Sequence, residues 1–477
     1  MEPRAIEKGP LLQPRQTNQS LDIIILAAGL GTRMKSGRAK VLHELGGLPL
    51  ITYVCRTARS LGPGKIYVVV GHQGAEVERA VRTEVGDTAK FVTQAEQRGT
   101  GDAVMAARAQ LEDSESLVLV LSGDVPLIRA QTLASFIDQH RGTGAACSIL
   151  SVRLENPTGY GRILRDENDQ FVHIVEQKDA TSEEQKVKEI NSGIYCFAAR
   201  KLFAALKRVN PSNKQGEFYL TDVPQILRSD GEKVNVCLHG DAREVSGINT
   251  RAELAEFENL LRRGTIRKLM IEAGVTFIDP SHAYVSAEAQ VGKDCIIYPD
   301  VAIEGKTTIG ENCEIRSGTR ITNSRLGNGV VVKDHCVITD SEIESNCSVG
   351  PFAHLHMNTL LEEGSVAGNF VEVKNSRLGR GSKSKHLTYL GDATIGEKTN
   401  IGAGTVTCNY DGKKKHQTII EDDVKIGADT MLVAPVRVGR GSVTAAGSVV
   451  TEDVPPDTLV AGVPAVVKKR LKHSDES

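Results

Sequence analysis

The chain has 477 residues, with 58 Lys and Arg against 60 Asp and Glu, and a net charge of −2 excludes nucleic-acid binding by bulk charge. Hydrophobic residues make up 40% and charged residues 25%, which excludes a wholly disordered chain. At ~100–200 residues per domain this length corresponds to two to four domains. No apolar run approaches the roughly 18 residues of a membrane helix. Nine scattered cysteines without a CxxC pair favour a reduced, cytoplasmic protein over a disulfide or zinc scaffold.

The N-terminal half has the pattern of an α/β domain. Residues 1–20 are polar, contain three prolines and lack the apolar core of a signal peptide, so we expect a disordered leader. Over residues 21–250, apolar runs alternate with amphipathic stretches, which predicts a doubly wound, Rossmann-like sheet. Three apolar runs read as buried parallel strands, Ile23–Leu26, Ile66–Val70 and Leu117–Leu121.

A long helix over residues 251–273, interrupted at Gly264, is expected to connect this domain to a second one. From Val291 the hydrophobic period becomes six, which indicates hexapeptide repeats, and we expect a left-handed parallel β-helix over residues 274–465. Residues 466–477 are then a charged tail. The positions that keep this frame, aliphatic except for Thr444, are Val291, Ile297, Ile303, Ile309, Ile315, Ile321, Leu326, Val332, Ile338, Ile343, Val349, Leu355, Leu361, Ile395, Ile401, Ile420, Ile426, Leu432, Val438, Thr444 and Val450.

The repeat also accounts for residues that would otherwise resemble a chemical site. We expect four cysteines to fill small inward positions of the β-helix rather than to bind metal or carry redox chemistry, namely Cys295, Cys313, Cys336 and Cys347. The pattern breaks at Thr407–Gln417, which predicts a long inserted loop, and loops that interrupt a solenoid often carry function.

A small-residue segment, AAGLGTRMKSGRAK (27–40), follows the first predicted strand. Small side chains allow the backbone to approach a phosphate, and backbone N–H groups favour an anion there. Arg33 and Lys40 add fixed positive charge. The segment contains neither the Walker pattern GxxxxGK[ST] nor GxGxxG, so it predicts a phosphate-binding loop of another kind.

This segment is similar to that of sugar-1-phosphate nucleotidylyltransferases. Further stretches match the same family in order: QAEQRGTGDA (94–103), SGDVPL (122–127), NPTGYGRI (156–163), IVEQKDA (174–180), EINSGIY (189–195), GEFYLTD (216–222) and VSGIN (245–249). With the hexapeptide repeats that follow, residues 21–464 resemble the bifunctional N-acetylglucosamine-1-phosphate uridylyltransferase/glucosamine-1-phosphate N-acetyltransferases of bacterial envelope synthesis.

The resemblance implies a first site that transfers a uridylyl group from UTP. Asp124 follows a predicted strand, at the carboxyl end where open α/β sheets bind ligands. By resemblance, Asp124 and Asn249 hold Mg²⁺, and Arg33 and Lys40 neutralise triphosphate charge. The implied nucleotide and sugar contacts are Leu26, Ala27, Ala28, Gly29, Lys40, Gln94, Gly99, Thr100, Ser122, Gly123, Asp124, Gly161, Glu176, Asn191 and Asn249.

The resemblance also implies an acetyl-transfer site in the stretch KHLTYLGDA (385–393), which we expect to interrupt the β-helix. His386 is the implied general base, because a near-neutral imidazole accepts the proton of an attacking amine. The implied contacts to glucosamine-1-phosphate and acetyl-CoA are His356, Lys374, Tyr389, Asn400, Ala403, Asn409, Tyr410, Ala428 and Ala446.

Three positions depart from the family's pattern. The family's PFAxLRP stretch has an arginine that clamps the sugar phosphate, and this chain has His356 in PFAHLHM. A CoA-side arginine of some members is replaced by Gly462, and Ser122 stands where some relatives have tyrosine. The change at His356 puts phosphate affinity, and with it the acetyl step, in question.

The expected function is therefore a two-step synthesis of UDP-N-acetylglucosamine by a cytoplasmic homotrimer that binds small molecules. Acetyl-CoA and glucosamine-1-phosphate react first, and the product then reacts with UTP and Mg²⁺. Two alternatives are a nucleotidylyltransferase with a decayed solenoid, which His356 favours, and a solenoid used only for trimerisation or regulation. The intact HLTYLGD and TCNYDG stretches oppose the former, and a bare trimerisation module has no need of His386, Tyr389 or Asn409.

Overall fold

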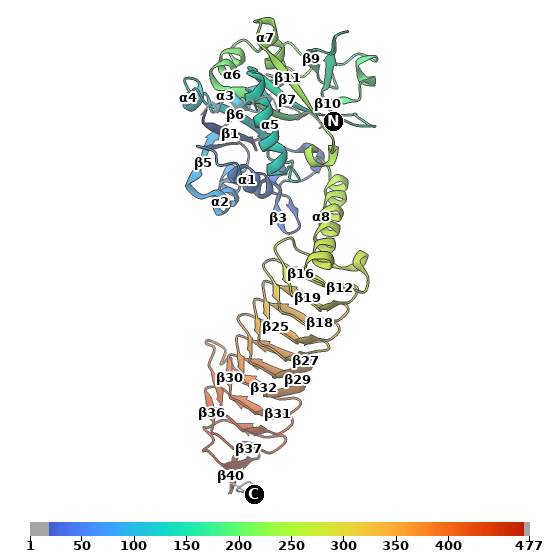
Figure 1. The fold of residues 1–477 in the computed structure, drawn as a ribbon. Helices are drawn as coiled ribbons and strands as arrows, with labels where there is room; N and C mark the ends of the chain where they lie inside the picture. The colour runs from blue at the N-terminus through green and yellow to red at the C-terminus, as the bar shows by residue number, and fades with distance from the viewer. Residues whose placement is uncertain (1–18, 472–477) are drawn as a thin grey trace, which may run out of the picture. The chain divides into compact units, whose positions relative to one another are not determined.

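The computed structural model describes residues 19–471, so the expected leader, apart from residues 19 and 20, lies outside the described residues. The chain divides into two compact units, one up to Phe257 and one from Glu258 onward. Each unit has its own hydrophobic core (Figure 1).

The first unit is built on one twisted sheet with strand order β11-β7-β10-β6-β1-β4-β5. These strands are β1 (Leu21–Leu26), β4 (Ile66–Val70), β5 (Ala89–Thr93), β6 (Leu117–Ser122), β7 (Cys147–Arg153), β10 (Glu189–Ala198) and β11 (Val234–His239). Shorter strands outside this order are β2 (Glu44–Leu45), β3 (Leu48–Pro49), β8 (Arg162–Arg165) and β9 (Phe171–Val175).

The three predicted strands are confirmed as parallel, because β1 pairs in parallel with both β4 and β6. The sheet is nevertheless mixed, since β10 runs antiparallel to both β6 and β7. Burial alone does not encode strand direction: β10 is as apolar along its second half as any parallel strand.

Helices cover both faces of the sheet, so the doubly wound fold class is confirmed. Along β1, Ile23 and Ile25 belong to one core cluster and Ile24 to the other, as the two-residue alternation of a strand requires. Residues of α1, α2 and α5 join the first cluster, and residues of α3, α4, α6 and α7 join the second. The helices are α1 (Leu50–Ser60), α2 (Gly74–Val85), α3 (Thr100–Met105), α4 (Arg108–Leu111), α5 (Ala130–Thr143), α6 (Ala199–Leu206) and α7 (Val223–Ser229).

Helix α8 (Arg251–Glu272) begins with a capping box and runs without a break. Thr250 Oγ1 accepts from the Glu253 N–H at 3.2 Å, and the Glu253 carboxylate accepts from the Thr250 N–H at 2.9 Å. The expected interruption at Gly264 is wrong: one interior glycine costs a helix only about 1 kcal/mol, which the remaining turns outweigh.

The second unit is a parallel β-helix whose coils are stacked by strand pairing (Figure 1). Paired residues lie one coil apart in sequence, as in Gln290 with Thr308 and Glu314 with Val331. One face consists of β14 (Gln290–Val291), β17 (Thr308–Ile309), β20 (Arg325–Leu326), β23 (Glu342–Ile343), β26 (Leu360–Leu361), β28 (Arg377–Leu378), β30 (Ala393–Ile395), β33 (Thr418–Ile420) and β36 (Val436–Val438).

The other faces share a second ladder of strands. Its first half is β12 (Thr276–Phe277), β13 (Tyr284–Val285), β15 (Ile296–Ile297), β16 (Ala302–Glu304), β18 (Glu314–Ile315), β19 (Arg320–Thr322), β21 (Val331–Val332), β22 (Val337–Thr339), β24 (Ser348–Val349) and β25 (His354–His356). Its second half is β27 (Val366–Lys374), β29 (Lys383–Gly391), β31 (Asn400–Ile401), β32 (Val406–Cys408), β34 (Lys425–Ile426), β35 (Met431–Val433), β37 (Val443–Thr444), β38 (Val449–Val450), β39 (Thr458–Ala461) and β40 (Val466–Arg470).

The aliphatic residues of the six-residue repeat form the core of this unit, as predicted, and every one of them is buried. Cys295, Cys313, Cys336 and Cys347 are buried beside them as free thiols, so their expected packing role is confirmed. A mainly aliphatic prism of this kind explains why the chain needs so few aromatic residues.

The stretch that carries His386 does not interrupt the β-helix, contrary to expectation. Strand β29 continues the ladder, with Lys383 paired to Val366 and Tyr389 to Glu372. Of its inward positions, Ser384 and Thr388 are polar and only Leu390 is aliphatic, which hides part of the repeat in the sequence.

The predicted inserted loop is confirmed between β32 and β33, where paired residues Thr394 and Ile419 are farther apart in sequence than elsewhere. At the C-terminal end, residues 466–470, expected to begin a charged tail, form β40, which is antiparallel to β39. Residues 472–477 lie outside the described part of the chain.

Candidate functional sites

A cleft of about 430 Å³ opens at the carboxyl ends of β1 and β6. These ends lie side by side because Leu26 pairs with Ser122, so the two loops that follow them meet at one edge of the sheet. The cleft brings together most of the residues expected to contact a nucleotide, namely Leu26, Ala27, Ala28, Gly29, Lys40, Gln94, Gly99, Thr100, Ser122 and Asp124. Gly123, also expected, lies beside them, with its N–H on the Leu26 carbonyl at 2.9 Å.

Two cations and two oxygen-bearing side chains form the polar centre of this cleft. Lys40 Nζ makes an ion pair with Asp124 and donates to Asn249 Oδ1 at 3.1 Å. Arg33 donates to the same oxygen at 2.8 Å. Asp124 is only 8% exposed, so its charge is weakly screened and Lys40 balances it. The four residues predicted for phosphate and metal chemistry are therefore in one cluster.

Glu253 positions this cluster, and the sequence reasoning missed it. Its carboxylate accepts the backbone N–H groups of Asn249 at 2.6 Å and of Thr250 at 2.9 Å. Asn249 is thereby fixed where α8 begins. The signal was present in the sequence, because Thr250 and Glu253 have the T-x-x-E spacing of a capping box.

The loop from Gln94 to Thr100 shapes the opposite wall of the cleft. Gln94 Nε2 donates to the Gly99 carbonyl at 3.1 Å and to Asp102 Oδ2 at 2.9 Å, which fixes the plane of the side-chain amide. Gly99 has a φ of +109°, and a Cβ there would lie 2.5 Å from the Phe218 carbonyl oxygen. Only glycine fits this position.

The residues expected to contact the sugar form a second group next to the cleft. The Asn191 N–H donates to the Gly161 carbonyl at 2.9 Å, and a Cβ on Gly161 would lie 3.4 Å from Glu176 Oε1. Burial raises the pKa of Glu176, and Thr221 Oγ1 donates to it at 3.3 Å. The structure thus brings all three together.

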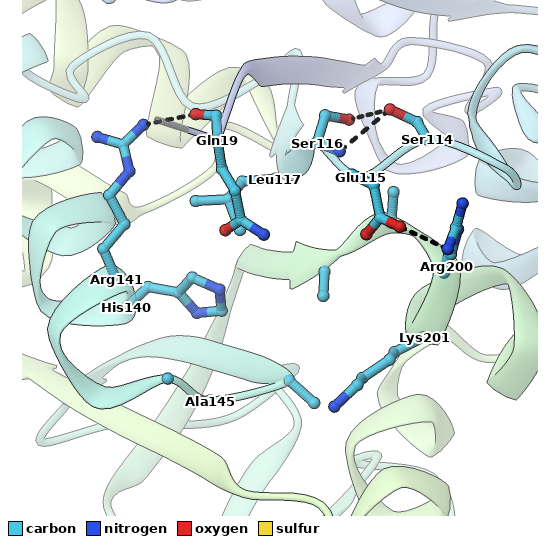
Figure 2. Close-up of a pocket in the computed structure, with 14 residues that line it drawn as sticks. Gln19, Ser114, Glu115, Ser116, Leu117, His140, Arg141, Ala145, Arg200 and Lys201 are labelled. Carbon is cyan, nitrogen blue, oxygen red and sulfur yellow. Dashed lines mark hydrogen bonds and ion pairs between the residues drawn. The ribbon is translucent and has the colours of Figure 1, made fainter. Parts of the chain in front are cut away.

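A second cavity of about 420 Å³ lies at the other end of the strands, where β6 begins and β10 ends (Figure 2). Arg200 pairs there with Glu115 at 2.5 Å, and Arg141 donates to the Gln19 carbonyl at 3.3 Å. Buried His140 contacts Ser148 Oγ at 2.8 Å, and burial lowers its pKa to about 4. None of the predicted site residues lines this cavity.

In the β-helix, His386 lies exposed on β29 beside Asn369 of β27. His386 Nδ1 is 2.8 Å from Asn369 Oδ1. The amide oxygen can only accept, so Nδ1 carries the proton and Nε2 keeps its lone pair. Sequence reasoning missed Asn369, although it precedes His386 by one coil of 17 residues.

A polar group forms where β29 ends. Asn409 Nδ2 donates to Asp392 Oδ2 at 2.5 Å, and the Lys374 carbonyl accepts from the Asp392 N–H at 3.0 Å. The Tyr389 hydroxyl and the Asn409 amide both lie over Gly391, in space that any side chain at this glycine would fill. Lys374, Tyr389 and Asn409, predicted separately, therefore converge.

His386 does not join this group within one chain. The backbone bends at Leu387, which has a φ of +44°, so that Lys383 pairs with β31 but Tyr389 pairs with β32. His386 lies before the bend, and Tyr389 lies after it. The single chain thus presents two halves of the expected acetyl-transfer site.

The remaining predicted contacts are spread along the prism. Ala403 and Ala428 occupy corresponding corners of successive coils, since the Ala403 carbonyl accepts from Asp429 at 2.7 Å and the Ala428 carbonyl accepts from Gly447 at 2.8 Å. Ala446 follows in the next coil, next to Gly447. Asn400 pairs with Lys425, and Tyr410 is exposed in the inserted loop.

His356 lies in β25, in register with Lys374. Its Nε2 is 3.1 Å from Glu372 Oε1, and its ring stacks on His354 with centroids 4.1 Å apart. The position expected for an arginine is thus occupied by an imidazole that already has a carboxylate partner.

Comparison with known proteins fits this geometry. Residues 23–222 match the model of the MobA-like NTP transferase domain, residues 280–376 that of the GMPPB C-terminal domain, and residues 417–452 that of six bacterial transferase hexapeptide repeats. The bifunctional protein GlmU of Syntrophomonas wolfei is 47% identical over 453 residues, which cover 95% of this chain and 98% of the relative. The chain belongs to the GlmU family.

Two further GlmU proteins support the assignment. That of Heliobacterium modesticaldum is 49% identical over 94% of this chain and 96% of its own length, and that of a Geobacillus strain is 46% identical over 91% and 94%. The protein is accordingly a bifunctional enzyme, a uridylyltransferase and an acetyltransferase that acts on small molecules. Among its described residues, no helix is long and apolar enough to cross a membrane.

Proposed function

We propose that this enzyme acetylates glucosamine-1-phosphate with acetyl-CoA and then couples the product to UTP, which yields UDP-N-acetylglucosamine and pyrophosphate. The convergence of Arg33, Lys40, Asp124 and Asn249 at one edge of the sheet carries the assignment of the second step. Two separate units in one chain fit two separate reactions. Nine free cysteines are in keeping with a reduced, cytoplasmic compartment.

In uridylyl transfer, positioning and charge neutralisation do most of the work. Asp124 and Asn249 offer a carboxylate and an amide oxygen, the hard donors that Mg²⁺ prefers, and these two would hold the ion. When bound, Mg²⁺ would neutralise phosphate charge. Lys40 contacts both side chains and Arg33 contacts the Asn249 oxygen, and the two cations would move to the triphosphate as it enters. Gln94 faces the base, and Glu176 and Asn191 face the N-acetylglucosamine part.

In acetyl transfer, His386 would take the proton of the substrate amine as the nitrogen attacks the thioester carbonyl and CoA thiolate leaves. Asn369 holds the imidazole in the tautomer that leaves Nε2 as a base. Lys374 and His356 would bind the sugar phosphate, with Tyr389, Asn400, Asn409 and Tyr410 around the substrate. The column of Ala403, Ala428 and Ala446 leaves room for the pantetheine arm of CoA.

The acetyl site would be completed by neighbouring copies in a homotrimer. His386 and Tyr389 lie on opposite sides of a bend, so one chain does not enclose the substrate. Three large apolar side chains lie exposed along this region, Phe352 (48%), Phe370 (54%) and Leu387 (64%). Covering them in a trimer would bury apolar surface and close the site.

The test follows free CoA from glucosamine-1-phosphate and acetyl-CoA without UTP, and pyrophosphate from UTP and N-acetylglucosamine-1-phosphate in a parallel assay. We expect His386→Ala to lower CoA release by about 10²–10⁴-fold, the usual contribution of a general base, with pyrophosphate release unchanged. Asp124→Asn is the matched control, which should lower only pyrophosphate release. CoA release that does not depend on His386 would contradict the proposal, and no release at all would leave a uridylyltransferase alone.

A further inference from the structure

Two histidines and one glutamate form a cluster on the outer surface of the β-helix. His354 and His356 alternate with Leu355, which is fully buried, so both imidazoles project outward from β25. Glu372 of β27 is directly opposite His354 in the next coil. Nitrogen and oxygen atoms of all three side chains lie within 4.8 Å of one another, and no other such group of His, Cys, Asp and Glu occurs among residues 19–471.

The contacts among these three side chains are compatible with their binding one metal ion. The two rings are parallel within 4° at a centroid distance of 4.1 Å, which disfavours two charged imidazoles. Within residues 19–471 the His354 ring stacks on His356 and makes no hydrogen bond, so its ring nitrogens are available as ligands. His356 Nε2 and Glu372 Oε1 are already 3.1 Å apart.

We propose that His354, His356 and Glu372 bind a divalent transition metal, Zn²⁺ in the first instance, with an open position that takes a phosphate oxygen of the sugar substrate. Two imidazoles and a carboxylate are a known zinc ligand set that leaves a fourth position open. Tetrahedral bonds of ~2.0–2.2 Å place ligand atoms roughly 3.4 Å apart. The three ligand atoms, which lie within 4.8 Å of one another, would draw together by side-chain rotation around a bound ion. The phosphate role rests on the proposed acetyltransferase function.

The neighbourhood supports that role. Lys374, proposed to contact the sugar phosphate, pairs in register with His356 on the adjacent strand. Tyr389 pairs with Glu372 on the coil after that. A metal ion here would restore fixed positive charge where the chain has an imidazole in place of the arginine expected from the family. Arginine cannot bind a metal, so His356→Arg replaces the positive charge of a bound metal ion with that of a guanidinium group.

The first experiment measures metal binding without any assay of activity. Full-length protein stripped with a chelator is titrated with Zn²⁺ by calorimetry and with Co²⁺ by visible absorption, whose d–d bands report tetrahedral coordination. We expect one tight site per chain, weakened at least tenfold in His354→Ala and in His356→Arg. His282→Ala is the matched control, because His282 has a carboxylate neighbour, Asp279, at 2.8 Å but no second imidazole. Zinc affinity unchanged by both cluster variants overturns the site.

The second experiment compares acetyl transfer with and without zinc, in the absence of UTP. We expect removal of zinc to raise the KM for glucosamine-1-phosphate about tenfold in the parent, with little change in kcat, and to have no effect on His356→Arg. Zinc binding with an unchanged KM overturns the phosphate role and leaves the metal site. Zinc binding with no CoA release in any sample overturns the acetyltransferase assignment and with it the phosphate role. Circular dichroism of each variant checks that the substitutions leave the fold intact.

Discussion

The capping box at the start of α8 links the stability of the first unit to its chemistry. Glu253 accepts two backbone N–H groups, at 2.6 and 2.9 Å, and one of them belongs to Asn249, a proposed metal ligand. Glu253→Ala removes both hydrogen bonds and the negative charge at the helix N-terminus. Asn249 would keep its side-chain contacts to Arg33 and Lys40 but lose the constraint on its backbone.

The size of the effect follows from these contacts. A hydrogen bond to a charged group contributes about 1.5–3 kcal/mol net, and solvent around the half-buried Glu253 favours the lower end. A helix cap typically contributes about 1 kcal/mol. The cap consists of these same two hydrogen bonds, so its contribution is not added to theirs. We therefore expect Glu253→Ala to lower the free energy of unfolding of the first unit by about 3 kcal/mol. The displaced Asn249 should raise the Mg²⁺ concentration for half-maximal activity about 3–10-fold, at most 1.4 kcal/mol.

Urea unfolding and pyrophosphate release over a Mg²⁺ titration measure the two effects. Glu253→Gln keeps an acceptor oxygen and should restore most of the metal response. Glu256→Ala, at an exposed position one turn along the same helix, is the control for loss of a surface carboxylate. An unchanged Mg²⁺ requirement in a destabilised Glu253→Ala protein would refute the link and leave Glu253 as a helix cap only.

Three further substitutions test other parts of the structure. Gly99→Ala places a Cβ against the Phe218 backbone, 2.5 Å from its carbonyl oxygen, and should raise the KM for UTP at least tenfold in steady-state assays; a normal KM would show that the loop adapts. Burial raises the pKa of Asp222 to about 6 from 3.8, so the folded state holds this proton more tightly than the unfolded state and stability falls as pH rises from 4 to 6. Asp222→Asn should therefore stabilise the protein at pH 7–8 and lose that advantage below pH 4, as melting temperatures across pH will show; a stabilisation independent of pH would contradict the assignment. Ile321→Ala removes a fully buried side chain and should cost the β-helix about 2–5 kcal/mol in urea unfolding, whereas a loss below 1 kcal/mol would mean that the coils close the cavity.

The β-helix could be predicted in detail because its six-residue hydrophobic pattern is visible within short stretches of sequence. One aliphatic residue in six points inward, so positions such as Ile303 and Val332 reveal the fold without any knowledge of pairing. The exception is β29, where the inward residues Ser384 and Thr388 are polar and conceal part of the repeat, although Leu390 follows it. The direction of β10 was not predictable, since the same burial suits a parallel and an antiparallel strand.

The site residues divide in the same way. Resemblance located Asp124 and His386, but their partners Lys40 and Asn369 could be assigned to them only from the structure. Contacts between successive coils follow a separation of 17 or 18 residues, as in His386 with Asn369 and His354 with Glu372. Once that separation is known, such pairs can be read from the sequence, although the side-chain geometry that makes them useful cannot.

The β-helix is a stack of similar coils along one axis, so the residues at its two ends determine where the stack stops. A stack of coils has an unpaired strand at each end, and any free edge is a template for another chain. Here β40 runs back along β39 with a row of lysine and arginine, and Ile266 of α8 belongs to the same core as Phe277 of the first coil. Strand β40 and helix α8 thus cover the two ends and prevent β-helices from associating end to end into fibres. A chain that ends at Ala465 should consequently associate lengthwise, as light scattering would detect, and would remain discrete if the exposed edge alone were harmless.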